Sequence, residues 1–250
     1  MDIRGGSISC IIFQQVDGFS RHRLLTSLAL SVMDMISFGA QVGAIYIPFL
    51  FALCFHEFSH AWMAKKRGDN TAEMMGRLTM NPLAHMDIVG TLVLPLMSLA
   101  FGSSVFFGWA KPVPFNYRNL KNPRVDAFWI ALAGPMSNFL LAIISAFAAV
   151  AIEIYALGHP QLIGVKEILS RFLVTNLFLG FFNALPVHPL DGGKIIARFL
   201  PSRWNYFLEQ NESWTGLILM FLIFTGMLSF LVYPVLMTAE YLLRFAGAIL

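Results

Sequence analysis

The chain has 250 residues, of which 57% are hydrophobic and only 12% are charged, and its formal net charge is +3. Soluble domains carry about 25% charged residues, so this composition argues against a soluble protein and indicates an integral membrane protein. The small net charge requires no nucleic-acid partner. The two cysteines, Cys10 and Cys54, form neither a Cys-x-x-Cys metal motif nor a disulfide framework.

Five apolar stretches divide the chain, at about 24–64, 88–107, 126–157, 168–186 and 214–250. A helix crosses a bilayer with about 20 apolar residues, so we expect the first stretch to form two helices, near 24–38 and 41–64. The last stretch is expected to break near Pro234. The segment 1–23 is polar and lacks the apolar core of a cleaved signal peptide. These features predict an all-α polytopic membrane protein with about five or six transmembrane helices.

The stretch 88–107 raises a question of topology. Three of the loops between apolar stretches are rich in Lys and Arg, and such loops stay on the cytoplasmic side of a membrane. A full span at 88–107 places the first two basic loops on opposite sides. The stretch contains Gly90 and Pro95, so we predict a re-entrant hairpin that returns all three loops to one side; an ordinary span is the alternative.

The motif "HEFSH" lies inside the first apolar stretch and contains His56, Glu57 and His60. Helix positions i and i+4 share one face, so both imidazoles can reach one metal ion. In the pattern H-E-x-x-H, two neutral imidazoles bind Zn²⁺ and the carboxylate acts as general base toward water. The bare pattern also occurs by chance. Ionisable groups within a membrane segment are rare and costly, however, and this favours the metal site.

A catalytic zinc takes three protein ligands, and the candidate for the third is Asp191, within "FFNALPVHPLDGGKI". Pro186 and Pro189 precede it, and Gly192 and Gly193 follow it. We expect non-helical backbone here, which at membrane depth must line a cavity. The alternative is that Pro-Leu-Asp-Gly-Gly is simply a turn.

Three other residues are rivals for the third ligand position. His188 lies three residues before Asp191, and His85 and Asp87 lie in the sequence "NPLAHMD". Histidines in loops near membranes are more often solvated or hydrogen-bonded than metal-bound. The residues alone leave this choice open.

Several motifs in order resemble the site-2 protease family of intramembrane zinc metalloproteases, in its short bacterial form without PDZ or CBS domains. The resemblance runs from about Phe55 to Pro201. Its motifs are HEFSH, RGDNTAEMMGRLTMNPLAHMDIVGT, FGWAKPVPFN, ALAGPMSNFLLA and FFNALPVHPLDGGK. It implies one membrane metalloprotease domain over 1–250, with a polar N-terminal segment and a core at about 41–201.

The resemblance also implies roles for single residues. His56, His60 and Asp191 would bind one Zn²⁺ per chain, Glu57 would be the general base, and Asn183 would help to bind substrate or the developing oxyanion. Asn183 has the alternative role of packing a helix through its amide. The Pro-Val-His-Pro sequence before Asp191 departs from the family pattern, and its histidine could tune or gate the site.

The activity that follows is hydrolysis of a peptide bond within or next to a transmembrane segment of a membrane protein. A helical substrate must unwind, and the strand-like FGWAKPVPFN or the segment before Asp191 could pair with it as an added strand. We expect a bacterial inner membrane location, with the active site nearer the cytoplasm. The alternatives are a metal-binding membrane transporter and a catalytically inactive binding module of the same fold.

Overall fold

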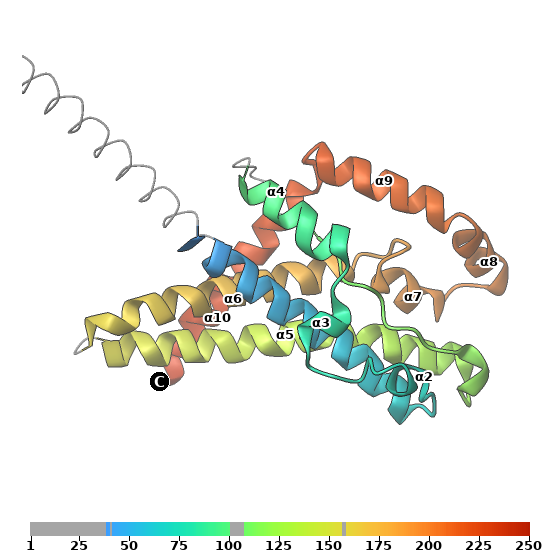
Figure 1. Ribbon diagram of the computed structural model, residues 1–250, viewed down its shortest axis with the longest axis horizontal. Coiled ribbons are helices and arrows are strands. Elements are labelled where there is room, and N and C mark those ends of the chain that lie inside the picture. Colours follow the sequence, from blue (N-terminus) through green and yellow to red (C-terminus); the bar gives the residue numbers. More distant parts are fainter. Residues whose placement is uncertain (1–38, 41, 101–107, 157–158) are drawn as a thin grey trace, which may run out of the picture. The chain divides into compact units, whose positions relative to one another are not determined.

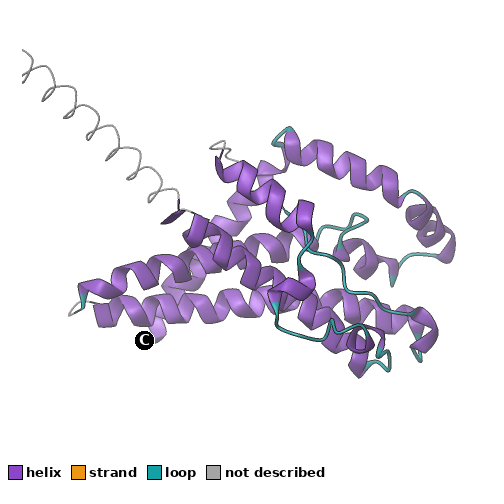
Figure 2. Ribbon diagram, viewed as in Figure 1, coloured by secondary structure: helices purple, strands orange, loops and turns teal. Residues whose placement is uncertain are grey.

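The computed structural model describes residues 39–40, 42–100, 108–156 and 159–250. By their internal contacts, the residues form one unit at Met1–Gly43 and a second at Ala44–Leu250; the second is described here (Figure 1). The predicted helix at 24–38 and the polar segment before it lie outside the described residues. Within the described part, every regular element is helical and no strand occurs (Figure 2).

Three described helical stretches are long and apolar enough to cross a membrane. They are the HEFSH helix (Val42–Lys66), α5 (Pro123–Ala156) and the stretch Met227–Ile249, which ends in α10 (Val232–Ile249). The 21-residue helix α6 (Ile163–Asn183) has three charged side chains in its first half. The prediction of an all-α membrane protein is confirmed. The predicted number of spans also included 24–38, which the described residues do not cover.

The short helices occupy the connections between these long elements. They are α2 (Thr71–Met74), α3 (Pro82–His85), η1 (Ile88–Val93), α4 (Leu94–Ala100), η2 (Tyr117–Asn119), η3 (Pro160–Leu162), α7 (Asp191–Ala197), α8 (Ser202–Gln210), α9 (Glu212–Phe224) and η4 (Met227–Leu231). Helices α5 and α6 are separated by residues 157–162 alone, so no domain is inserted between them.

The main apolar core lies where α5, α6 and α10 pack together. Ala142 and Ala146 of α5 are fully buried against Leu173 and Leu177 of α6 and Val235 of α10. Lipid is as apolar as these side chains, so helices in a membrane associate mainly through close packing, which small residues permit. The two alanines therefore let α5 approach its neighbours closely.

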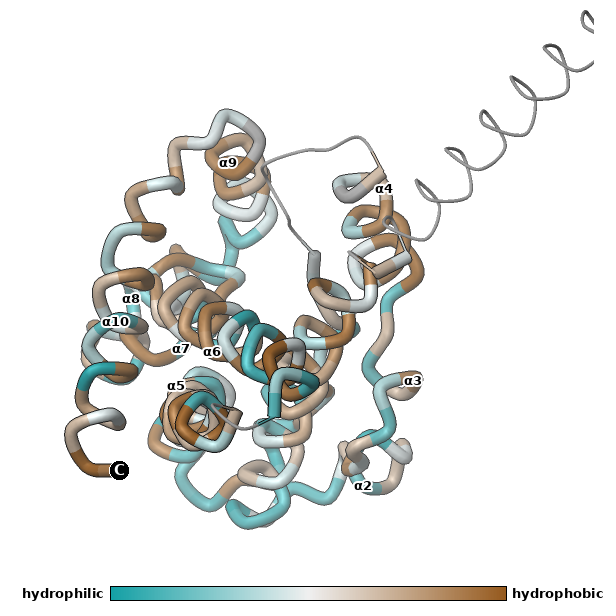
Figure 3. Tube along the Cα trace, turned by 90° about the vertical axis from the view of Figure 1, so that its left-hand side faces the viewer, coloured by the Kyte–Doolittle hydropathy of each residue, from teal (hydrophilic) through white to brown (hydrophobic). Residues whose placement is uncertain are grey.

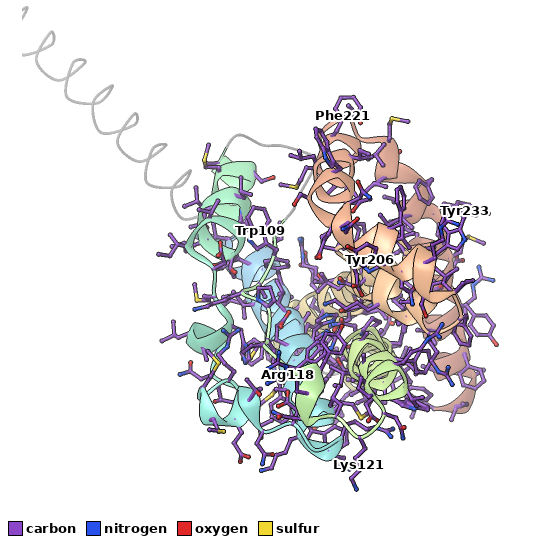
Figure 4. The ribbon with its side chains drawn as sticks, turned by 90° about the vertical axis from the view of Figure 1, so that its right-hand side faces the viewer. Trp109, Arg118, Lys121, Tyr206, Phe221 and Tyr233 are labelled. Carbon is purple, nitrogen blue, oxygen red and sulfur yellow. The ribbon has the colours of Figure 1, made fainter. Side chains whose placement is uncertain are left out.

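The outer surface matches a membrane environment. Hydrophobic colour runs along α5, α6 and α9, while hydrophilic colour gathers in the loops beside α2 (Figure 3). Phe221 on α9 and Tyr233 at the start of α10 project outward and are exposed (Figure 4). Arg118 and Lys121 project from the loop before α5. Exposed aromatic side chains are expected where a helix faces lipid or its interface.

The ends of the stretch 88–107 lie side by side. The Trp109 N–H donates to the Gly90 carbonyl at 3.1 Å, and the Thr91 hydroxyl donates to the Trp109 carbonyl at 2.7 Å. A Cβ atom at Gly90 would lie 2.4 Å from the Trp109 ring, so this close approach requires glycine. Residues 90–91 and 109 therefore lie next to each other, as a hairpin requires; residues 101–107 lie outside the described residues, and re-entry into the membrane stays a prediction.

The three basic loops meet at one end of the bundle. Arg67, after the HEFSH helix, lies 3.5 Å from the carboxylate of Asp126 in the first turn of α5. Arg124, also in that turn, donates to the Leu200 carbonyl beyond α7. The arrangement agrees with the prediction that all three loops share one side of the membrane.

The expected break near Pro234 was wrong. The helix breaks earlier, at Gly226, whose φ of +72° is a left-handed conformation that favours glycine. Pro234 lies in the first turn of α10. Proline is tolerated there because the N–H groups of the first turn have no acceptor within the helix.

Candidate metal centre

The HEFSH helix presents its two histidines to one point. His56 and His60 are buried, their rings are nearly perpendicular, and their Nε2 atoms lie 3.0 Å apart. The spacing of four residues produces this arrangement because one helical turn brings such side chains onto the same face. The third group comes from far along the sequence: Asp191 Oδ2 lies 3.0 Å from His56 Nε2 and 3.1 Å from His60 Nε2.

Among the described residues, these three are the one group of three or more His, Cys, Asp or Glu side chains that could hold a metal ion. Their candidate ligand atoms all lie within 4.8 Å of one another. The structure thus brings together the three residues that the sequence analysis assigned as ligands. The compact N, N, O donor set fits Zn²⁺ with a fourth position left for water or substrate.

The backbone around Asp191 differs in part from the prediction. Residues 184–190 are non-helical, as expected, but Asp191 begins α7, and Gly192 and Gly193 are helical residues within it. A Cβ atom at Gly192 would lie 2.1 Å from the Leu185 carbonyl oxygen. Glycine costs about 1 kcal/mol in a helix. Here its lack of a side chain lets the preceding loop pack directly against α7.

Hydrogen bonds on the far side of each ring orient the two histidines. His60 Nδ1 contacts the Ile130 carbonyl oxygen at 2.7 Å, and His56 Nδ1 contacts Asn138 Oδ1 at 2.7 Å. A carbonyl oxygen only accepts, so His60 carries its proton on Nδ1 and directs the Nε2 lone pair toward Asp191. Lone pairs and a carboxylate oxygen this close repel one another unless a cation or a proton lies between them.

Gly134 of α5 leaves the space that the imidazoles occupy. A Cβ atom at this position would lie 2.4 Å from His60 Nε2 and 2.6 Å from His56 Cε1. The sequence analysis gave no role in the site to Gly134 or Asn138. Both belong to the motif ALAGPMSNFLLA, which was the available signal, but the motif does not say which side chains face the histidines.

Glu57 lies beside the histidines and is almost buried, with 8% of its surface exposed. Its Oε2 atom accepts a hydrogen bond of 3.0 Å from the Val113 N–H. Glu57, the two histidines and Asp191 all line one cavity of about 640 Å³. Much of the remaining wall comes from α5, α6, α9 and the segment 108–116.

The segment 108–116 contains no regular helix or strand, so the strand-like loop expected here forms no strand pairing of its own. Four of its N–H groups donate to acceptors within the protein, those of Trp109, Lys111, Val113 and Asn116. The alternate positions 112 and 114 are proline and have no N–H to offer. A substrate strand therefore finds few free donors here, which argues against strand addition to this segment.

Asn183 lies near the end of α6, and its side chain lines the same cavity. Its Nδ2 atom donates to the Leu179 carbonyl one turn earlier at 3.0 Å. The amide carries two hydrogens, so one remains available toward the cavity. The structure therefore accommodates both uses that the sequence suggested, helix packing and substrate contact.

The three rival ligands lie elsewhere. His188 is buried but does not belong to the group of three, and burial lowers its pKa. His85 Nε2 contacts the Thr79 carbonyl at 2.8 Å. Asp87 accepts hydrogen bonds from the first N–H groups of η1 and so caps that helix. The choice of Asp191 over these residues is consistent with their positions.

A known protein family and several known proteins match most of the chain. Residues 44–228 match the sequence profile of peptidase family M50. YwhC of Bacillus subtilis is 36% identical over 194 residues, which cover 77% of this chain and 85% of YwhC. Rip2 of Mycolicibacterium smegmatis is 29% identical over 205 residues, which cover 82% of this chain and 76% of Rip2.

A more distant relative is MJ0392 of Methanocaldococcus jannaschii, 24% identical over 183 residues, which cover 73% of this chain and 41% of MJ0392. The names of all three relatives class them as zinc metalloproteases. No solved structure matches the chain at a significant level.

Proposed function

The chain belongs to peptidase family M50 and is a metalloprotease, and from this premise we propose that it hydrolyses a peptide bond within or next to a transmembrane segment of a membrane protein. The observation that carries the proposal is the joint placement of His56, Glu57, His60 and Asp191 around one cavity, in a chain with three described helices long and apolar enough to cross a membrane. A protease for soluble peptides would not need an active site surrounded by helices that can cross a membrane. We also propose that residues 1–250 form one protease domain.

We propose that His56, His60 and Asp191 hold one zinc ion. Two imidazoles and a carboxylate match the ligand types of catalytic zinc sites, and the contacts of the opposite ring nitrogens keep the rings in place. When bound, zinc supplies a Lewis acid that polarises a carbonyl group and lowers the pKa of water to about 7. Asp191 balances one of the two charges of the ion.

Glu57 is proposed as the general base. Its Oε2 atom is held by the Val113 N–H, which leaves the other oxygen to accept a proton from water and pass it to the leaving amine. Glu57 lines the same cavity as the three proposed ligands. The low exposure of Glu57 excludes competing bulk water from this exchange.

Asn183 is proposed to bind the substrate. Its free amide hydrogen can donate to the carbonyl oxygen under attack, where negative charge develops. The largely apolar walls of the cavity suit the side chains of an unwound transmembrane segment. We therefore propose membrane proteins with a transmembrane segment as substrates.

The location of the site follows from the basic loops. Arg198 directly follows α7, which begins with Asp191, and the other basic loops meet this end of the bundle. Positively charged loops remain in the cytoplasm. We propose that the protein resides in a bacterial inner membrane with its active site nearer the cytoplasmic side.

The test is the substitution Glu57→Gln in the purified full chain, with a model transmembrane substrate in detergent or liposomes. We expect cleavage to fall by roughly 10²- to 10⁴-fold, the usual contribution of a general base, while zinc content is unchanged. Ser59→Ala is the matched control, because the Ser59 hydroxyl donates to its own helix at Phe55. Cleavage by the Glu57→Gln variant at the rate of the unsubstituted protein would contradict the proposed role.

The same variant separates the alternatives. A metal transporter would still move zinc after Glu57→Gln, because its function needs ligands but no base. An inactive binding module would hold zinc in the unsubstituted protein and cleave none of the substrates offered. Only the protease predicts loss of cleavage with zinc retained.

A further inference from the structure

Two amide side chains are completely buried between membrane-spanning elements. Asn138 of α5 and Asn176 of α6 are both 0% exposed. An amide removed from water costs free energy unless its hydrogen bonds are replaced, and lipid offers no replacement. Their partners within the protein therefore show what these residues do.

The hydrogen bonds of the two amides form a chain that begins at a candidate metal ligand. Asn138 Oδ1 lies 2.7 Å from His56 Nδ1. Asn138 Nδ2 donates to Asn176 Oδ1 at 2.9 Å and to the Ala52 carbonyl at 3.2 Å. Asn176 Nδ2 in turn donates to the Phe172 carbonyl at 2.9 Å. Three helices are thus linked behind His56.

Two backbone carbonyl groups fix the direction of every hydrogen bond in this series. The carbonyls of Ala52 and Phe172 can only accept, so both amides must turn their NH₂ groups toward them. The oxygen of Asn138 must then face His56. An oxygen without a hydrogen can only accept, so His56 must carry a proton on Nδ1, and in the neutral imidazole the lone pair of Nε2 then faces His60 and Asp191.

We infer that Asn138, held in place by Asn176, is a positioning residue that locks His56 in the tautomer and orientation required to bind zinc. The inference rests on the zinc ligation proposed above. It deepens that proposal, because it names the group that keeps the Nε2 atom of His56 available to bind the metal. Metal-binding histidines generally need such a partner on the second ring nitrogen.

The two histidines differ in how they are held. His60 donates to a backbone carbonyl, that of Ile130, which no substitution removes. His56 depends on a side chain. Replacing Asn138 therefore releases one ligand and leaves the other in place. A role in helix packing alone would need the NH₂ donors of Asn138 toward Ala52 and Asn176 but not its oxygen toward His56.

The experiment measures zinc affinity by competition with a chelator, on the purified full chain in detergent. Asn138→Leu is expected to weaken zinc binding by roughly 10- to 100-fold, the usual effect of losing such a partner. Asn138→Asp keeps an acceptor for His56 Nδ1 but turns its second oxygen toward the acceptors of Ala52 and Asn176, so its zinc affinity is expected to fall less than that of Asn138→Leu. Asn176→Leu leaves Asn138 its bond to Ala52 and is expected to cause a smaller loss than Asn138→Leu.

Ser145→Ala is the control for removal of a buried polar group from the same helix, because the Ser145 hydroxyl bonds only to Leu141 one turn before it. Its zinc affinity should not change. A second readout is the ¹⁵N signal of the His56 ring in the zinc-free chain. It should report one tautomer, protonated on Nδ1, in the unsubstituted protein and in Asn138→Asp, and a mixture of tautomers in Asn138→Leu.

Two results would overturn the inference: unchanged zinc affinity in Asn138→Leu, or equal losses in the Leu, Asp and Ser145→Ala variants, which would indicate a general effect on folding. Failure of the unsubstituted protein to bind zinc is a different result. It would remove the proposed function itself and is distinguished by measuring that protein first.

Discussion

Two buried carboxylates in this molecule have opposite surroundings. Asp69, just after the HEFSH helix, accepts four hydrogen bonds, from the N–H and hydroxyl of Thr71, the Asn116 N–H and the Asn119 amide. Asp191 contacts two imidazole nitrogens whose lone pairs face it. Both are removed from solvent. The first is satisfied by neutral donors of the protein, and the second is surrounded by further acceptors.

The number of hydrogen-bond donors around a buried carboxylate distinguishes a structural role from metal binding. Donors around Asp69 stabilise its charge without any ion, and together they tie the loop before α5 to the end of the HEFSH helix. A buried charge that lacks donors is strongly destabilising. Asp191 therefore requires a cation or a proton shared with the imidazoles, while Asp69 requires neither.

The largest effect should appear when each of the two carboxylates is removed in turn. Asp191→Ala should reduce zinc affinity by more than the roughly 100-fold expected for losing an outer partner, and cleavage should disappear with it. Asp69→Ala should leave one zinc per chain. Zinc content by elemental analysis and chelator competition measure both. Equal zinc loss in the two variants would erase the distinction between these carboxylates.

A second effect concerns the space around the ligands. Gly134→Ala introduces a Cβ atom 2.4 Å from His60 Nε2, so the imidazoles must shift and zinc affinity should fall by at least 10-fold, comparable to the loss of an orienting partner. Gly164→Ala, on α6, is the matched control because nothing lies within 4 Å of its Cβ position. Zinc binding by Gly134→Ala as tight as in the control would contradict the account of this contact.

A smaller effect is expected on stability at the other carboxylate. Asp69→Asn replaces one acceptor oxygen with an NH₂ group that faces donors, which should cost roughly 1–3 kcal/mol of unfolding free energy. Zinc affinity should not change. Denaturation in detergent, followed by circular dichroism, measures the loss. A variant as stable as the unsubstituted protein would show that these hydrogen bonds contribute little.

The smallest effect is a pH dependence of the same group. Burial raises the pKa of Asp69, but hydrogen bonds from Thr71, Asn119 and Asn116 outweigh it and hold the pKa below its ordinary value of 3.8. A lowered pKa in the folded state stabilises the protein above the unfolded value, and this contribution is lost as the pH falls below it. The stability difference between the unsubstituted protein and Asp69→Asn should therefore narrow below about pH 4. A difference that is constant between pH 3 and pH 7 would contradict this.

The sequence was sufficient for features that depend on local spacing. His56 and His60 share a helical face because of their four-residue separation, and the contact between residues 90–91 and 109 agrees with the hairpin predicted at 88–107 from charge bias and from its glycine and proline content. Asp191 was identified through its motif and the expected antiparallel course of the preceding helices. Helix geometry fixes the relation between the two histidines, whereas Asp191, which is distant in sequence, was identified from its motif.

Features that depend on the packing of distant helices could not be predicted. Asn138 faces His56 only because of the rotation of α5 against the HEFSH helix, which no local pattern encodes. Gly226 and Pro234 are both helix breakers, and the fold decides which one breaks the chain. Gly192 was expected to interrupt a helix but lies within α7, where its missing side chain leaves space for the Leu185 carbonyl.

The most direct test of the account is zinc K-edge X-ray absorption on the purified full chain, combined with metal analysis. We predict one zinc per chain, with two imidazole nitrogens at about 2.0–2.1 Å and a carboxylate oxygen at about 2.0–2.2 Å, and loss of this signal in Asp191→Ala. A chain without zinc, or a zinc with sulfur at about 2.3 Å, would contradict the claim that His56, His60 and Asp191 form the metal site.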